Sequence, residues 1–143
     1  MSVITSTTHT TANNNNNPII LLVDDEKDVL NLFCEYLQAL GYQSVSFDNP
    51  LHALNYADNN ISNCSSLVII TDYKMPQMNG IDFIKRIREK YNKNFQVKIM
   101  LTSAFMKNDL HIQNAMNNLN IDKIIEKPIR LEILKDEIKK LMN

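Results

Sequence analysis

Three carboxylates and one lysine of this sequence come shortly after short apolar runs. Asp24 and Asp25 follow the first run, Asp72 follows a second, and Lys127 comes shortly after a third. If these runs are neighbouring parallel strands, the three acids meet at one edge of a sheet. Like charges held close together in a partly dry crevice repel one another and raise at least one pKa. A divalent cation or a fixed ammonium group, which Lys127 could supply, would offset this repulsion.

A sheet is needed to bring these residues together, and the sequence contains five short apolar runs that alternate with amphipathic stretches. The apolar runs predict strands over residues 19–23, 44–47, 67–71, 97–101 and 123–126. The amphipathic stretches predict helices over residues 27–40, 51–57, 81–90, 107–118 and 131–142. Such alternation is typical of an α/β protein with a doubly wound parallel sheet and helices on both faces, because right-handed crossovers place each helix over the sheet.

The composition of the runs predicts the order of the strands. The first, third and fourth runs are nearly continuous in Ile, Leu and Val, as expected of strands covered on both faces, whereas the second and fifth contain more polar residues. Edges at the second and fifth strands favour the flavodoxin-like order 2-1-3-4-5 over the dinucleotide-binding order. Ligands of such sheets bind beyond the carboxyl ends of the strands, where the strand order reverses. That position lies between the first and third strands, where Asp24, Asp25 and Asp72 are expected.

Composition and charge narrow the class of protein. The chain has 143 residues, 44% of them hydrophobic, which is enough for one domain with a substantial core. The formal net charge of -1 provides no electrostatic footprint for nucleic acid or an anionic membrane. The sequence also has no run that approaches the roughly 20 apolar residues of a membrane span. The two cysteines and three histidines show no ligand spacing, so the sequence supports neither a disulfide nor zinc.

The first 17 residues differ in composition from the rest of the chain. They are rich in Ser, Thr and Asn and end in five consecutive asparagines, a composition that cannot bury enough apolar surface to offset the entropy of ordering. We predict a disordered tail over residues 1–17 and one domain over residues 18–143. The N-terminus lacks the basic and apolar regions of a secretory signal, so we expect a cytoplasmic protein.

Four segments match short motifs in a fixed order. They are LVDDE at 22–26, TDYKMPQMNG at 71–80, LTSA at 101–104 and EKPI at 126–129. With these motifs the chain resembles the response regulator receiver domain of two-component signalling, in a stand-alone form like the chemotaxis regulators. The resemblance covers about residues 18–143. It implies that Asp72 receives a phosphoryl group from a histidine kinase or a histidine phosphotransfer protein, and that the domain catalyses its own phosphorylation and dephosphorylation and no reaction of a separate substrate.

The resemblance also implies a magnesium site. Asp24, Asp25, Asp72 and the backbone carbonyl of Lys74 would hold the ion. Magnesium is a hard cation that takes oxygen ligands in an octahedral shell and usually keeps several waters, so this set of ligands suits it.

Two further residues receive roles from the resemblance. Lys127 would contact the Asp72 carboxylate and then the phosphoryl group, and the Thr102 hydroxyl would turn toward that group as the switch. The signal would pass through the face formed by helix 107–118, strand 123–126 and helix 131–142. Many receiver domains have an aromatic residue three positions before the lysine, where this sequence has Ile124. Pro128 matches a family position at which the preceding peptide bond is cis.

Several functions remain open at this point. A receiver fold that binds partners independently of phosphorylation is the alternative to a phosphorylated regulator. A magnesium-dependent phosphatase would use a second acid two residues after Asp72, where Lys74 stands. A nucleotide site would need a glycine-rich loop, and the sequence contains only two glycines. The chain ends directly after the fifth helix, so we expect a single-domain regulator that docks on an unidentified downstream protein or relays its phosphoryl group; the sequence identifies neither its kinase nor its target.

Overall fold

The computed structural model describes residues 18–60, 66–91, 96–104 and 109–142. Residues 1–17, where we predict the tail, and residues 107 and 108, the start of the fourth predicted helix, lie outside the described residues. The strands are β1 Ile19–Val23, β2 Ser44–Phe47, β3 Ser66–Asp72, β4 Gln96–Ser103 and β5 Lys123–Glu126. The helices are α1 Lys27–Ala39, α2 Pro50–Asn60, α3 Gly80–Lys90, α4 Leu110–Asn118 and α5 Leu131–Met142.

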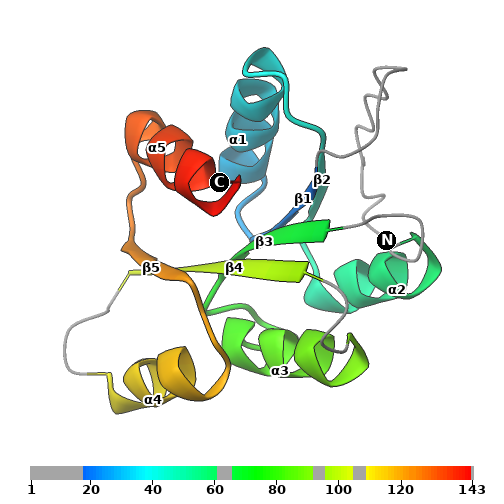
Figure 1. Cartoon of the computed structure of the whole chain (residues 1–143), viewed down its shortest axis with the longest axis vertical. Coiled ribbons are helices and arrows are strands. Elements are labelled where there is room, and N and C mark those ends of the chain that lie inside the picture. The colour runs from blue at the N-terminus through cyan, green and yellow to red at the C-terminus, as the bar shows by residue number, and fades with distance from the viewer. Residues whose placement is uncertain (1–17, 61–65, 92–95, 105–108, 143) are drawn as a thin grey trace.

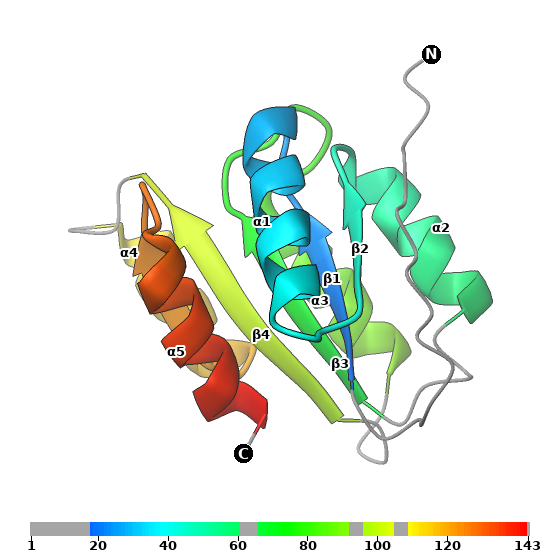
Figure 2. The same ribbon diagram turned by 90° about the horizontal axis from the view of Figure 1, so that it is seen from above.

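The five strands form one parallel sheet in the order β2-β1-β3-β4-β5 (Figure 1). This order confirms the predicted α/β fold, with β2 and β5 at the two edges. Helices α1 and α5 cover one face, and α2, α3 and α4 cover the other, as Figures 1 and 2 show from two directions. Among the described residues, no helix is long and apolar enough to cross a membrane.

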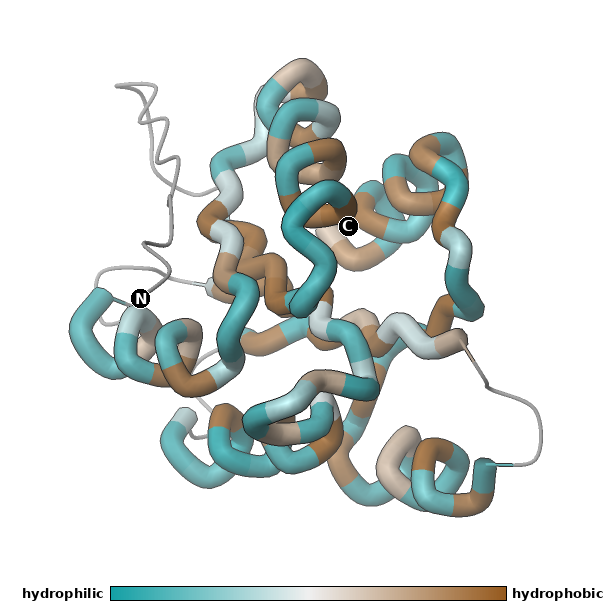
Figure 3. The backbone as a smooth tube through the Cα atoms, turned by 180° about the vertical axis from the view of Figure 1, so that it is seen from behind, coloured by the Kyte–Doolittle hydropathy of each residue, from teal (hydrophilic) through white to brown (hydrophobic). Residues whose placement is uncertain are grey.

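Alternate residues of the central strands face two separate halves of the core. In β1, Ile20 and Leu22 pack with α1 and α5, whereas Leu21 and Val23 pack with the helices of the other face. This period of two is the geometry of an extended strand. Figure 3 shows the hydrophobic colour gathered in the strands, while the helices carry alternating hydrophobic and hydrophilic bands. Both faces of the sheet are therefore covered, as the nearly continuous apolar runs predict.

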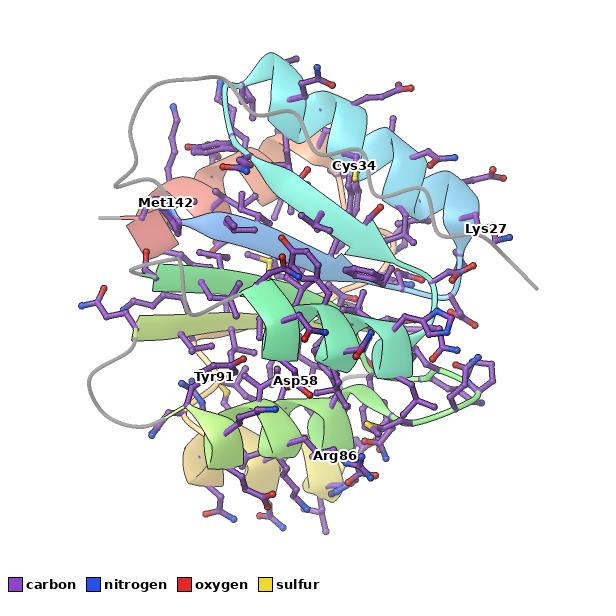
Figure 4. The ribbon with its side chains drawn as sticks, turned by 90° about the vertical axis from the view of Figure 1, so that its right-hand side faces the viewer. Lys27, Cys34, Asp58, Arg86, Tyr91 and Met142 are labelled. Carbon is purple, nitrogen blue, oxygen red and sulfur yellow. The ribbon has the colours of Figure 1, made fainter. Side chains whose placement is uncertain are left out.

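Helices α2 and α3 are joined at their ends by polar contacts. The hydroxyl of Tyr91 donates a hydrogen bond to the carbonyl oxygen of Ala57 at 2.8 Å, and Lys90 forms an ion pair with Asp58. Figure 4 labels Asp58 and Tyr91 near this junction, and Cys34 on the opposite layer, where its thiol is half-buried against the core. These contacts hold the carboxyl ends of α2 and α3 together.

Two strands are longer at the functional edge than the sequence predicts. Strand β3 ends at Asp72, where it is paired with Thr102, and strand β4 ends at Ser103, where it is paired with Glu126 of β5. Helix α2 is also longer than predicted and runs from residue 50 to residue 60. The extended ladder means that Asp72 and Thr102 are held by strand pairing and not by a loop.

Candidate functional site

The three predicted carboxylates meet at the carboxyl ends of β1 and β3. Val23 is paired with Thr71, so the residues that follow, Asp24 and Asp72, lie side by side. Asp24 and Asp72 are buried, with 5% and 6% of their surface exposed, whereas Asp25 is exposed. One carboxylate oxygen from each of the three lies within 4.8 Å of the others. The sheet therefore brings Asp72 together with Asp24 and Asp25, which are far from it in the sequence.

Lys127 projects into this cluster from the residue after β5. Its Nζ lies 2.9 Å from Oδ2 of Asp24 and 3.2 Å from Oδ2 of Asp72, and only 15% of its side chain is exposed. The Lys127 backbone N–H donates to the carbonyl oxygen of Ser103 at 2.8 Å, which fixes the start of the side chain against β4. The Lys127–Pro128 peptide bond is cis, as the resemblance implies. An ammonium group in this position offsets the repulsion between the two buried acids.

The charges in the cluster shift two pKa values. Burial, followed by the charge of Asp24, raises the pKa of Asp72 from 3.8 to about 6, although Lys127 acts in the opposite direction. Burial alone would lower the pKa of Lys127, but the hydrogen bonds and charges of Asp24 and Asp72 outweigh it and raise that pKa above its ordinary value. At neutral pH Asp72 is therefore an ionised carboxylate beside a protonated lysine. This is the protonation state that a carboxylate nucleophile needs.

The oxygen atoms of the cluster fit a hard divalent cation. Oδ1 of Asp24 accepts a hydrogen bond from the Glu26 backbone N–H at 2.9 Å, which fixes the orientation of that carboxylate. Lys74 lines the same cleft as Asp25 and Asp72, so its backbone carbonyl is available nearby. Magnesium prefers carboxylate and carbonyl oxygens and keeps water in its remaining positions, which an open cleft allows. The donors present here are all oxygen atoms, and the partly exposed position of Asp25 leaves room for water.

Thr102 lies beside Asp72 on the neighbouring strand. The two residues are paired across the β3–β4 ladder, and Thr102 is almost fully buried. Its hydroxyl donates to the carbonyl oxygen of Thr71 at 3.4 Å, a long hydrogen bond that is weaker than one near 2.8 Å. A weak hydrogen bond is readily exchanged for a stronger acceptor, so the hydroxyl can turn toward a charged group placed on Asp72.

The loop after Asp72 is closed by Gly80. The Gly80 N–H donates to the carbonyl oxygen of Tyr73 at 2.6 Å, and a Cβ atom on Gly80 would collide with the carbonyl oxygen of Asp72. Asn79 then caps α3, because its side chain accepts a hydrogen bond from the Asp82 N–H at 2.8 Å. A glycine is required here by the close approach of α3 to the functional strand.

The structure adds residues to the cleft that were not predicted from the sequence. Glu26 lies 3.4 Å from the Lys127 ammonium as a third carboxylate partner, and Asp109 and Tyr73 line the cleft beside Asp72. Glu26 adjoins the acid pair in the sequence, which was a usable signal. Asp109 carried none, because it lies outside the four motifs.

Comparison with known proteins decides the family. A family model described as the response regulator receiver domain matches residues 20–139, most of the chain. The chain belongs to the response regulator receiver domain family. Receiver domains are phosphoacceptor signalling domains, and the motifs around Asp72 and Lys127 fall within the matched region.

Relatives of this receiver domain include chemotaxis proteins and other response regulators. Chemotaxis protein CheY1 of Helicobacter pylori is 28% identical over 118 residues, which cover 80% of this chain and 89% of that protein. The response regulator receiver protein CpdR of Brucella abortus is 29% identical over 120 residues, which cover 83% of this chain and 92% of that protein. The crystallised chemotaxis protein CheY4 of Vibrio cholerae has a TM-score of 0.73 at 22% identity, over 87% of this chain and 98% of that one, and supports the fold.

Proposed function

We propose that this receiver domain is a response regulator that accepts a phosphoryl group on Asp72 from a phosphohistidine of a histidine kinase or a histidine phosphotransfer protein. The observation that carries the proposal is the position of Lys127, whose ammonium lies within hydrogen-bond distance of both Asp24 and Asp72. A lysine in that position holds the acceptor carboxylate in place. It also faces the negative charge that develops on the phosphoryl oxygens during transfer.

In the proposed reaction an Asp72 carboxylate oxygen attacks the phosphorus atom. A phosphorus–oxygen bond forms while the phosphorus–nitrogen bond to the donor imidazole breaks, and the imidazole, which is protonated on its other ring nitrogen, leaves as a neutral ring. The product is an acyl phosphate, which water later hydrolyses to restore Asp72 and release inorganic phosphate. The pKa of about 6 keeps Asp72 ionised at neutral pH, so no base is needed to remove its proton.

Magnesium, when bound, would neutralise charge on the transferring phosphoryl group. We assign it to Asp24, Asp25, Asp72 and the Lys74 carbonyl, which is the set that the sequence predicts. Asp24 is already oriented by the Glu26 N–H, and Asp25 is exposed to solvent water. The chain's own contribution is therefore a fixed acid, a fixed ammonium and a cleft that water can enter.

Thr102 is the proposed switch. A phosphoryl group adds up to about two negative charges and three acceptor oxygens. Its oxygens are stronger acceptors than the Thr71 carbonyl, which the Thr102 hydroxyl reaches only at 3.4 Å. The rotation of Thr102 would then alter the loop after β4 and the face made by α4, β5 and α5, to which an unidentified downstream protein binds. A cytoplasmic location stays a prediction.

Incubation with acetyl phosphate and Mg²⁺ tests the proposal. The intact protein should gain the mass of one phosphoryl group, and the Asp72→Asn variant should gain none. Asp58→Asn, a change in an exposed acid on α2, is the matched control and should be phosphorylated like the wild type. A wild-type protein that gains no phosphoryl group would support the alternative, an interaction module that works independently of phosphorylation.

A further inference from the structure

Helix α4 lies at the edge of its layer and is weakly anchored by apolar contacts. Figure 1 shows it at the end of the row formed with α2 and α3, near the edge strand β5. Within the described helix only Ile112 and Ala115 are buried, whereas Leu110 is 74% and Met116 39% exposed. A helix with so little buried apolar surface depends on its polar contacts for its position.

The carboxyl end of α4 is hydrogen-bonded to a side chain of α3. The Arg88 guanidinium donates to the carbonyl oxygens of Leu119 at 3.0 Å and Asn120 at 2.8 Å, and also to that of Val97 on β4 at 3.0 Å. Three hydrogen bonds from one planar group hold this end of the helix against the sheet. These bonds are distant from the cleft and contain no group that phosphorylation would change.

The amino end of α4 is instead hydrogen-bonded to a residue that lines the functional cleft. The hydroxyl of Tyr73 lies 3.1 Å from Nδ1 of His111 in the first turn of α4, and the two rings meet edge to face at 6.1 Å. The Tyr73 hydroxyl and Nδ1 of His111 share one hydrogen bond, and the tautomer of the His111 ring sets which of the two groups donates. Asp109 caps the same end of α4, accepting hydrogen bonds from the N–H groups of His111 and Ile112.

The backbone of Tyr73 is joined to the groups that phosphorylation would move. Tyr73 follows Asp72 directly, and its N–H donates to the carbonyl oxygen of Thr102 at 2.8 Å. Its own carbonyl accepts from Gly80 at the start of α3. A displacement of Thr102 or Asp72 therefore reaches the Tyr73 ring through covalent bonds and one short hydrogen bond.

We infer that Tyr73 is the positioning residue that couples the phosphorylation cleft to α4, acting through the hydrogen bond between its hydroxyl and Nδ1 of His111. The inference rests on the proposed function of Asp72 and adds the route by which the signal leaves the cleft.

Amide hydrogen exchange of the full chain tests this coupling, with beryllofluoride and Mg²⁺ as a stable mimic of a phosphoryl group on a carboxylate. Tyr73→Phe keeps the ring and removes the hydroxyl, and His111→Leu removes the ring nitrogen that the hydroxyl contacts. Tyr36→Phe on α1, on the opposite face of the sheet, is the matched control. Without the mimic, exchange of the α4 amides at residues 113–117 should be about fivefold faster in both test variants than in the wild type and the control, as expected for one lost hydrogen bond.

The response to the mimic separates coupling from simple support of the helix. In the wild type, exchange should change both at residues 71–73 in the cleft and at residues 113–117 in α4. In Tyr73→Phe and His111→Leu the cleft response should persist and the α4 response should fall at least threefold. The α4 response of the double variant should be no smaller than that of either single variant. An α4 response that is unchanged in these variants would overturn the coupling alone, as would loss of the cleft response in Tyr73→Phe. A wild-type cleft that does not respond would overturn the proposed function and the coupling with it.

Discussion

Replacement of Asp72 by Asn should stabilise the metal-free protein at neutral pH. Burial and the neighbouring charge of Asp24 raise the pKa of Asp72 from 3.8 to about 6 in spite of Lys127. The folded protein thus holds the Asp72 proton more tightly than the unfolded chain does, so the stability of the wild type falls as the pH rises through this window. Asn has nearly the same shape and is neutral at every pH, so the variant does not undergo this loss.

The size of the effect follows from the pKa. A rise from 3.8 to about 6 corresponds to about 3 kcal/mol in the free energy of unfolding once Asp72 is ionised in both states. About 2 kcal/mol of this difference should develop between pH 4.5 and pH 7.5, because below that interval the carboxyl group is increasingly protonated in the unfolded chain as well. The advantage of the Asn variant over the wild type should therefore grow by about 2 kcal/mol across this interval.

Urea denaturation followed by circular dichroism, in the presence of a chelator, measures this difference at the two pH values. Asp136→Asn changes an exposed acid on α5 and should alter the stability by less than about 0.5 kcal/mol at either pH. An Asp72→Asn variant that is no more stable than the wild type near pH 7.5 would refute the reasoning. An advantage that is equal at both pH values would also refute it, because the gain would then come from packing and not from the buried charge.

Three further predictions concern groups around the cleft. Lys127→Met should lower the free energy of unfolding by about 2 kcal/mol or more in urea denaturation near neutral pH, because Asp24 and Asp72 lose their shared ammonium; an unchanged value would show that the ion pairs add nothing. Gly80→Ala should lower the melting temperature, with a loss of about 2 kcal/mol or more, since its methyl group meets the Asp72 carbonyl oxygen, and a neutral result would contradict that close approach. Added Mg²⁺ should raise the melting temperature of the wild type. At a concentration of 100 times its dissociation constant, it should raise the free energy of unfolding by about 2.7 kcal/mol, but it should have little effect on Asp24→Asn. An equal response of the two proteins would place the ion elsewhere.

The fold could be predicted from the sequence because its strands differ in how continuous their apolar runs are. Leu67 to Ile70 are all buried between two helical layers, and such a run leaves little choice but a central strand. The ends of β3 and β4 could not be predicted in the same way, because strands seldom contain Asp and because Thr102 lies beyond the apolar run that defines β4. Asp72 is in a strand because it is paired with Thr102, and Thr102 is paired with both Asp72 and Ile125.

The convergence of the predicted site residues follows from the same logic. The ends of parallel strands meet at one edge, so the sheet order alone places Asp24 beside Asp72. Contacts made by side chains across the cleft could not be predicted from the sequence, because they depend on how the loops close. The hydrogen bond of the Thr102 hydroxyl to Thr71 and the contact of Tyr73 with His111, which is 38 residues away along the chain, carry no pattern in the sequence.

The central claim is that Asp72 is the acceptor and its acid neighbours are not. Treatment of the protein with acetyl phosphate and Mg²⁺, reduction of the acyl phosphate with borohydride, and peptide mass spectrometry locate the modified residue directly. We predict reduction at Asp72 alone, and none when a chelator replaces Mg²⁺. Modification at Asp24 or Asp25, or modification of Asp72 that is equally rapid with the chelator, would contradict the account.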